Sequence, residues 1–144
     1  MVQSKRLRPV QRIAESKELT AARELGDSRR YVHKQEERLN ELRQYHAEYL
    51  ERFHATAKIG MSALQLQEYR AFLAKLERAI REQEEIIAKG RNVQEFKKGN
   101  WQQKHVRTQI LGNVIDRYKK SESKANDKRE QNEADDRSQR NPGK

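Results

Sequence analysis

The sequence predicts an all-α protein in which two long helices pair as an antiparallel coiled-coil hairpin. Apolar residues recur at alternating steps of three and four, the spacing that places them on one helical face. Two such runs, residues 7–53 and 66–118, are separated by a short interval around Gly60. Ala, Glu, Lys, Leu and Arg make up 73 of the 144 residues, a composition typical of coiled coils.

Composition argues against a globular core. Leu, Ile, Val and Phe total only 27 residues, and 38% of the residues are charged, so we expect a long surface with little interior. The sequence contains no cysteine and therefore no disulfide or thiolate metal site. No apolar run reaches the roughly 20 residues that span a bilayer, and residues 1–10 lack the apolar stretch of a signal peptide. We therefore expect a cytoplasmic protein.

The first helix is predicted over about residues 5–53. Two consecutive steps of four, from Lys17 to Ala21 to Leu25, predict a stutter that locally unwinds the supercoil. The seam predicted for this helix consists of Leu7, Val10, Ala14, Lys17, Ala21, Leu25, Ser28, Val32, Gln35, Leu39, Leu42, His46, Tyr49 and Phe53.

The connection is predicted over about residues 54–61. Gly60 adopts the left-handed conformation that such loops need without steric cost. Ser62 and Gln65 have the spacing of a capping box, and Met61 and Leu66 occupy the hydrophobic-staple positions around it. These signals place the start of the second helix at about residue 62.

The second helix is predicted over about residues 62–120. Three glycines within it, Gly90, Gly99 and Gly112, each weaken a helix by roughly 1 kcal/mol relative to Ala, so we expect residues 90–108 to be loosely packed or ordered by a partner. Residues 121–144 have almost no apolar side chains, which predicts a disordered or frayed tail. The predicted seam consists of Leu66, Tyr69, Leu73, Leu76, Ile80, Gln83, Ile87, Gly90, Gln94, Lys97, Trp101, Lys104, Thr108, Leu111, Ile115 and Tyr118.

Charge is unevenly distributed along the chain. The net charge is +10, and the surplus lies in residues 1–30, with 8 basic and 4 acidic side chains, and in residues 91–120, with 8 and 2. An antiparallel hairpin makes these two stretches neighbours in a basic tip. Such a tip attracts an acidic protein or nucleic acid, unless it is simply a solvated face. Trp101 and Tyr118 either stack on bases there or pack in the seam.

The sequence offers no catalytic or metal constellation. Glu51-x-x-His54 has the spacing of half a di-iron site, but a second such pair is missing. His33, His46 and His105 have no ligand spacing, and there is no Gly-rich phosphate loop or nucleophile elbow. We therefore expect no enzyme activity, no cofactor and no bound metal.

Early in the second helix, a second row of side chains runs beside the seam. A hairpin needs only a narrow apolar stripe, so the extra width indicates a docking partner, a wider seam or self-association. The row steps by four and three through Phe72, Leu76, Ala79, Gln83 and Ile86.

Four motifs occur in an order and at a spacing that resembles the flagellar FliJ family, a coiled-coil component of the flagellar type III export apparatus. The similarity covers roughly residues 7–118. The motifs are Ala21-Ala22-Arg23-x-Leu25-Gly26, Leu39-x-x-Leu42-x-x-Tyr45-x-x-x-Tyr49, Gly60 in the loop, and Tyr69-x-x-Phe72-Leu73-x-x-Leu76-Glu77-x-Ala79-Ile80.

The resemblance implies a fold similar to the central stalk of rotary ATPases. It also implies three kinds of partner: the ring of the export ATPase FliI, the export gate protein FlhA, and flagellar substrate chaperones. A location at the cytoplasmic face of the inner membrane, at the flagellar base, follows from those partners.

The resemblance also implies sites. The gate-contacting positions of the family are matched here by Phe72, Leu76, Ala79 and Gln83. The basic tip corresponds to the part of the family that enters the ATPase ring, so we expect acidic ring groups to face Arg29, Arg30, Lys97, Lys98, Lys104 and Arg107. The alternatives are a basic coiled coil that binds nucleic acid or the ribosome, and a purely structural homo-oligomer.

Overall fold

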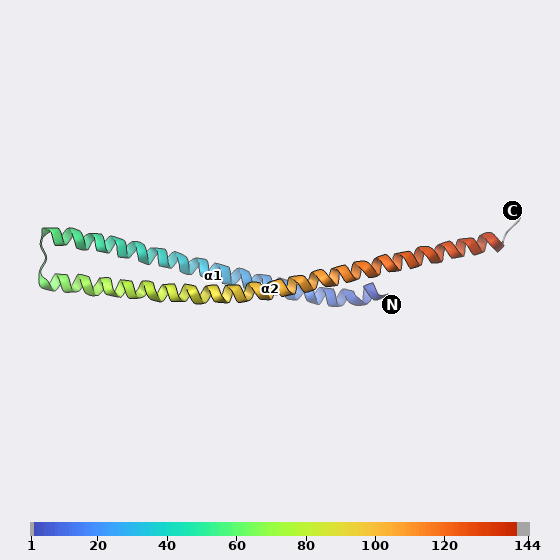
Figure 1. Ribbon diagram of the computed structural model, residues 1–144, viewed down its shortest axis with the longest axis horizontal. Coiled ribbons are helices and arrows are strands. Elements are labelled where there is room, and N and C mark those ends of the chain that lie inside the picture. Colours follow the sequence, from blue (N-terminus) through green and yellow to red (C-terminus); the bar gives the residue numbers. More distant parts are fainter. Residues whose placement is uncertain (1, 141–144) are drawn as a thin grey trace. The chain divides into compact units, whose positions relative to one another are not determined.

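The computed structural model describes residues 2–140, which form two helices, α1 (Gln3–Ile59) and α2 (Ala63–Arg140), traced from blue to red in Figure 1. No strand occurs within these residues. The predicted all-α fold class, with two long helices paired as a hairpin, is confirmed.

The chain divides into two compact units, each containing part of both helices. In residues 23–99, α1 and α2 run antiparallel on either side of the loop that joins them. The other unit combines the start of the chain, up to Ala22, with the part of α2 from Asn100 onward. Ser4 contacts Glu122 and Glu18 contacts His105, so the segments of this unit also pair antiparallel.

The helices are longer than the sequence predicted. Both ends of α1 extend past the predicted limits of about 5 and 53, and α2 continues past residue 120 to Arg140. Residues 121–140 are therefore helical where a disordered or frayed tail was expected, and residues 141–144 of that tail lie outside the described range. No Gly or Pro interrupts residues 113–140, and charges of opposite sign recur four apart, as at Glu133 and Arg137. Local helix preference thus accounts for a segment whose residues 123–140 are all exposed.

The loop is confined to residues 60–62. Gly60 has a φ of 126°, and its N–H donates to the carbonyl of Thr56 over 3.1 Å, closing the end of α1. The predicted capping box is confirmed. The backbone N–H of Gln65 donates to the Ser62 hydroxyl, and the backbone N–H of Ser62 donates to the Gln65 side chain, both over 3.1 Å.

The predicted seam of α2 is confirmed almost throughout. Every predicted position from Leu66 to Ile115 is buried or half-buried, and only Tyr118, at the end, is exposed. The steps of three and four therefore continue through Gly90, Gly99 and Gly112 without a change of phase. The buried apolar residues of both helices are Ala14, Ala21, Leu25, Val32, Leu39, Leu73, Leu76, Ile87 and Ile115.

Before Ala21, the predicted seam of α1 is right at Leu7 and Ala14 but wrong at Val10 and Lys17. Val10 and Lys17 are exposed, and the buried or half-buried positions include Ser4, Gln11 and Glu18 instead. With these residues the steps of three and four run unbroken from Ser4, so the predicted stutter does not occur. Polar side chains carry no hydrophobic signal, which is why the sequence pattern assigned their apolar or longer neighbours to the seam.

Two polar pairs join the helices near the start of α1. The hydroxyl and backbone N–H of Ser4 donate to the Glu122 carboxylate over 2.7 and 3.1 Å, and these bonds hold the pKa of Glu122 below its usual range. Glu18 lies 2.6 Å from His105 Nδ1, and that hydrogen bond is the main reason its pKa is lowered. Each pair satisfies groups that would otherwise lose hydrogen bonds to water in the seam.

Gly90 allows the two helices to approach closely. A Cβ added there would lie 3.2 Å from Val32 Cγ2 and 3.3 Å from Tyr31 Cε1. At Gly99, by contrast, an added Cβ would meet no atom within 4 Å. The two glycines have the same intrinsic effect on helix stability but different effects on packing.

We predict that Gly99→Ala raises the free energy of unfolding by up to about 1 kcal/mol, because Ala favours the helix and finds open space there. Gly90→Leu should lower it by about 1–3 kcal/mol, because the larger side chain forces α1 away. Thermal unfolding followed by circular dichroism checks both. Shifts of the same sign in the two variants would contradict the packing at Gly90.

We also predict that the Ser4–Glu122 pair loses its effect in acid. A carboxylate whose pKa is lowered on folding adds stability above the pKa of the unfolded chain, near 4.3, and that stability is lost as the pH falls through the lower, folded value. Amide exchange at residues 2–8 should therefore be faster in Glu122→Gln than in the native chain at pH 7, and the difference should vanish in acid. A difference that persists below about pH 3 would contradict this assignment.

Candidate functional site

The two sides of the seam differ in chemistry within residues 23–99. One side, which we name the charged flank, carries ion pairs that join the helices. Arg91 lies 3.0 Å from Glu36, and Arg43 lies 3.3 Å from Glu84. All four side chains are at least two-fifths exposed, so each pair contributes little stability, typically below about 1 kcal/mol.

The opposite side, which we name the apolar flank, carries aromatic and aliphatic side chains. The members of this flank on α2 begin at Phe72 and recur every seven positions to Val93, so they lie in one row along the helix. No charge interrupts this row over three heptads. The apolar flank consists of Tyr31 and Tyr45 from α1 and of Phe72, Ala79, Ile86 and Val93 from α2.

An aromatic cluster forms the loop-proximal end of the apolar flank. The ring centroid of Phe72 lies 4.4 Å from that of Tyr49 and 6.0 Å from that of Tyr45. Tyr69 lies 5.3 Å from Tyr49 and continues the contact toward Phe53. Desolvation of Tyr49 among these rings raises its pKa. Phe72 is therefore partly held by the helix pair and partly accessible.

The four predicted gate-binding residues do not share one environment. Leu76 and Gln83 are 7% and 8% exposed and belong to the seam. The Gln83 amide donates to the backbone carbonyl and side-chain oxygen of Gln35 over 3.0 and 2.8 Å. Phe72 and Ala79 are half-buried on the apolar flank. A partner that does not separate the helices meets the latter two residues.

Three residues of this flank, Tyr31, Tyr45 and Val93, were not among the predicted site residues, and Tyr45 was noted only as part of a family motif. Val93 lies one heptad beyond Ile86, so extending the second row by one step would have found it. Tyr31 and Tyr45 lie fourteen residues apart on α1, with Arg38 between them. Their place beside the second row depends on the pairing register of the two helices, which the sequence pattern alone does not fix.

The predicted ring-binding residues are distributed over both units. Arg29, Arg30, Lys97 and Lys98 belong to residues 23–99, and Lys104 and Arg107 belong to the other unit. Arg30 pairs with Asp27, and Lys97 lies 3.1 Å from Glu24. Lys98, Arg29 and Arg107 are exposed and form no ion pair within residues 2–140.

Trp101 contributes to packing rather than forming an open stacking platform. It is half-buried, and its ring stacks on His105 with centroids 5.1 Å apart and an interplanar angle of 16°. Tyr118 is more exposed, at 39%. Between Trp101 and Tyr118, therefore, only Tyr118 has a ring exposed enough within residues 2–140 to stack on a base.

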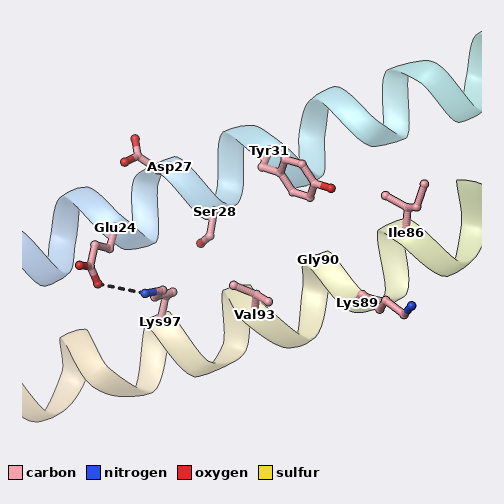
Figure 2. Close-up of a pocket in the computed structure, with 9 residues that line it drawn as sticks. All are labelled: Glu24, Asp27, Ser28, Tyr31, Ile86, Lys89, Gly90, Val93 and Lys97. Carbon is pink, nitrogen blue, oxygen red and sulfur yellow. Dashed lines mark hydrogen bonds and ion pairs between the residues drawn. The ribbon is translucent and has the colours of Figure 1, made fainter.

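A groove of about 520 Å³ lies on the apolar flank, between α1 and α2 (Figure 2). Tyr31 and Ser28 point from α1 toward α2, where Ile86, Gly90 and Val93 face them. The absent side chain of Gly90 leaves the space that Tyr31 covers. Charged side chains form the rim: Glu24 and Asp27 on α1, and Lys89 and Lys97 on α2.

Among residues 2–140, no three His, Asp or Glu side chains converge in a way that would hold a metal ion. Neither helix, over the part of the chain described, has a segment long and apolar enough to cross a membrane.

Comparison with known proteins identifies the family. The family model described as "Flagellar FliJ protein" matches residues 3–144. No curated protein and no solved structure matches the chain. The match includes both helices and both flanks and covers essentially the whole sequence. The chain therefore belongs to the flagellar FliJ protein family, whose members are components of the flagellar export apparatus.

Proposed function

We propose that the chain is a non-catalytic stalk and adaptor of the flagellar export apparatus. In this role it promotes the assembly and activity of the export ATPase FliI, couples the ATPase to the export gate protein FlhA, and handles flagellar substrate chaperones. The family match over residues 3–144 is the observation that carries the proposal. The location that follows is the cytoplasmic face of the inner membrane, at the flagellar base.

The arrangement of the helices supports an adaptor. Two helices that bury only a narrow seam leave both flanks exposed. A long exposed surface suits contacts with several partners at separate positions. The two flanks offer different chemistry, one charged and one apolar. A similarity to the central stalk of rotary ATPases is part of this proposal.

The gate contact is assigned to the apolar flank. Phe72 and Ala79 are its accessible members near the loop, and Ile86 extends the row. Leu76 and Gln83 support the contact from within the seam, where Gln83 fixes the register through Gln35. An apolar helix or strap of FlhA would bury the exposed side of Phe72.

The ring contact is assigned to the basic residues. Arg29, Lys98 and Arg107 are exposed and free of ion pairs within the described chain, so they are available to acidic groups of a FliI ring. Arg30, Lys97 and Lys104 complete the set. The surplus of basic side chains in residues 1–30 and 91–120 supports this assignment.

A basic coiled coil that binds nucleic acid or the ribosome is the alternative, favoured by the net charge of +10. A filter-binding assay with RNA separates the two functions. Nanomolar RNA binding without stimulation of FliI would support the alternative.

We predict that stimulation of purified FliI by this chain falls steeply as salt rises from about 50 to about 150 mM, because the Debye length shortens over that range. Lys98→Glu should reduce the stimulation severalfold at low salt and reduce its salt dependence. Arg81→Glu is the matched control, since Arg81 is also exposed and lies outside the basic stretches, and the substitution makes the same change in charge. Equal losses in the two variants, or no response to salt, would contradict the ring contact.

We predict that Phe72→Ala weakens binding to the cytoplasmic part of FlhA by about tenfold while leaving helicity intact, because it removes the partly accessible aromatic anchor of the apolar flank. Calorimetry measures the binding and circular dichroism measures the helicity. Tyr69→Ala is the control, because it removes a ring from the same cluster but from the seam. If Phe72→Ala lost helicity, or if Tyr69→Ala weakened binding equally, Phe72 would act through packing instead.

A further inference from the structure

We propose that the groove at Tyr31 binds a second copy of this chain, forming an antiparallel dimer related by a two-fold axis beside Tyr31. The argument for this dimer does not rest on the contacts proposed with the export ATPase and the gate, although the groove shares Ile86 with the gate row and Lys97 with the ring-binding set. It is argued from the shape of the groove, the exposure of its walls and the order of charges along α1.

The groove walls are unusually exposed for large apolar side chains. Tyr31 and Val93, which line the groove, are 50% and 51% exposed, and Phe96, one turn beyond Val93 and not itself part of the lining, is 73% exposed. Ile86 adds a fourth such side chain on the same side. Apolar side chains clustered around a concave surface mark an interaction site more often than isolated ones do.

The charges along this side of α1 are arranged about Tyr31. Glu24 and Arg38 lie seven residues before and after it, and Asp27 and Lys34 lie four before and three after. All four side chains are exposed. Each pair joins opposite charges, and the midpoint of each pair falls at or next to Tyr31.

Such an arrangement is self-complementary in an antiparallel dimer. A two-fold axis perpendicular to α1 at Tyr31 pairs residues that are equally distant from Tyr31 on opposite sides. Glu24 of one copy then meets Arg38 of the other, and Asp27 meets Lys34. Each of these contacts occurs twice, because the interface is isologous. Binding of an unrelated helix would not require the charges before Tyr31 on α1 to be complementary to the charges after it.

The same axis brings apolar residues of α2 together. Gly90 lies against Tyr31, so the axis passes α2 near that residue. Ile86 of one copy, four residues before Gly90, then approaches Val93 and Phe96 of the other, which follow it. Lys89 lies beside the axis, so it approaches Lys89 of the other copy. Because its side chain is exposed and flexible, it relieves this like-charge contact by turning toward solvent.

The charges needed for the dimer are available. Lys34 and Arg38 form no ion pair within residues 2–140. Glu24 and Asp27 pair with Lys97 and Arg30, but both pairs are exposed and of the kind that contributes little. Exchanging or sharing these partners therefore opposes dimer formation only weakly.

Sedimentation equilibrium of the full chain tests the proposal. We expect the average mass to rise from 17.1 kDa toward twice that value between about 5 and about 500 µM, as expected for a small, transient interface. Asp27→Lys and Lys34→Asp should each remain monomeric, because each places like charges together twice. The double variant Asp27→Lys/Lys34→Asp should dimerise again, because it restores opposite charges in the reversed order.

Glu41→Lys is the matched control. Glu41 is exposed and lies one heptad beyond Lys34, and its substitution by Lys makes the same change in charge as Asp27→Lys. In the proposed dimer the uncharged Thr20 of the other copy would lie opposite it. It should dimerise as the native chain does, and circular dichroism should show equal helicity in all variants. A native chain that is monomeric throughout, a dimer that Asp27→Lys leaves intact, or a double variant that stays monomeric would each overturn the proposal. If the chain stayed monomeric and Tyr31 became inaccessible to solvent only when FlhA was added, the groove would bind a foreign helix and not a second copy.

Cysteine cross-linking provides a second measurement on the same chain. The sequence has no cysteine, so a single introduced one is the only thiol. Tyr31→Cys should oxidise to a covalent dimer, because the two thiols meet at the axis. Arg29→Cys, which is exposed but outside the groove, should stay largely uncrosslinked. Equal cross-linking at both positions would indicate random collision and would overturn the two-fold arrangement.

Discussion

The structure depends on the unbroken alternation of three and four residues along the seam between α1 and α2. Because a coiled coil of this kind has no interior beyond the seam, every residue in it contributes to pairing. Small residues such as Ala14, Ala21 and Gly90 allow the helices to approach closely, and larger apolar residues such as Leu25, Leu73 and Ile87 are buried between them. Buried pairs such as Gln35–Gln83 then fix which residues face each other.

Much of this arrangement could be predicted from the sequence. Gly60 and the Ser62–Gln65 capping box located the loop because their signals are local. The seam of α2 was predictable because its phase is kept through the glycines. The early seam of α1 was not, because Ser4 and Glu18 have a seam role only through Glu122 and His105 of α2. The helix beyond residue 120 was missed because only Glu122 contacts α1 there, and residues 123–140 are all exposed and follow from local helix preference.

The candidate site was predictable only in part, and the reason is the pairing register. The second apolar row of α2 was visible as surplus hydrophobic width, and it identified Phe72, Ala79 and Ile86. The same pattern could not show that Leu76 and Gln83 turn into the seam or that Tyr31 and Tyr45 lie beside the row. The opposite flank carries two interhelical ion pairs, Glu36–Arg91 and Arg43–Glu84, whereas the apolar flank has the pair Glu24–Lys97 only at the rim of its groove. The gate contact proposed for this FliJ family member rests on that difference between flanks.

The central claim is that the chain doubles back, so that early residues of α1 lie beside late residues of α2. A distance measurement between spin labels at Arg12 and Arg107 tests it most directly, because both side chains are exposed and both belong to the same unit. Helices packed 8–10 Å apart place such labels within about 25 Å of each other. A single short distance is the predicted result. A distribution centred beyond about 50 Å would contradict antiparallel pairing and the flanks that depend on it.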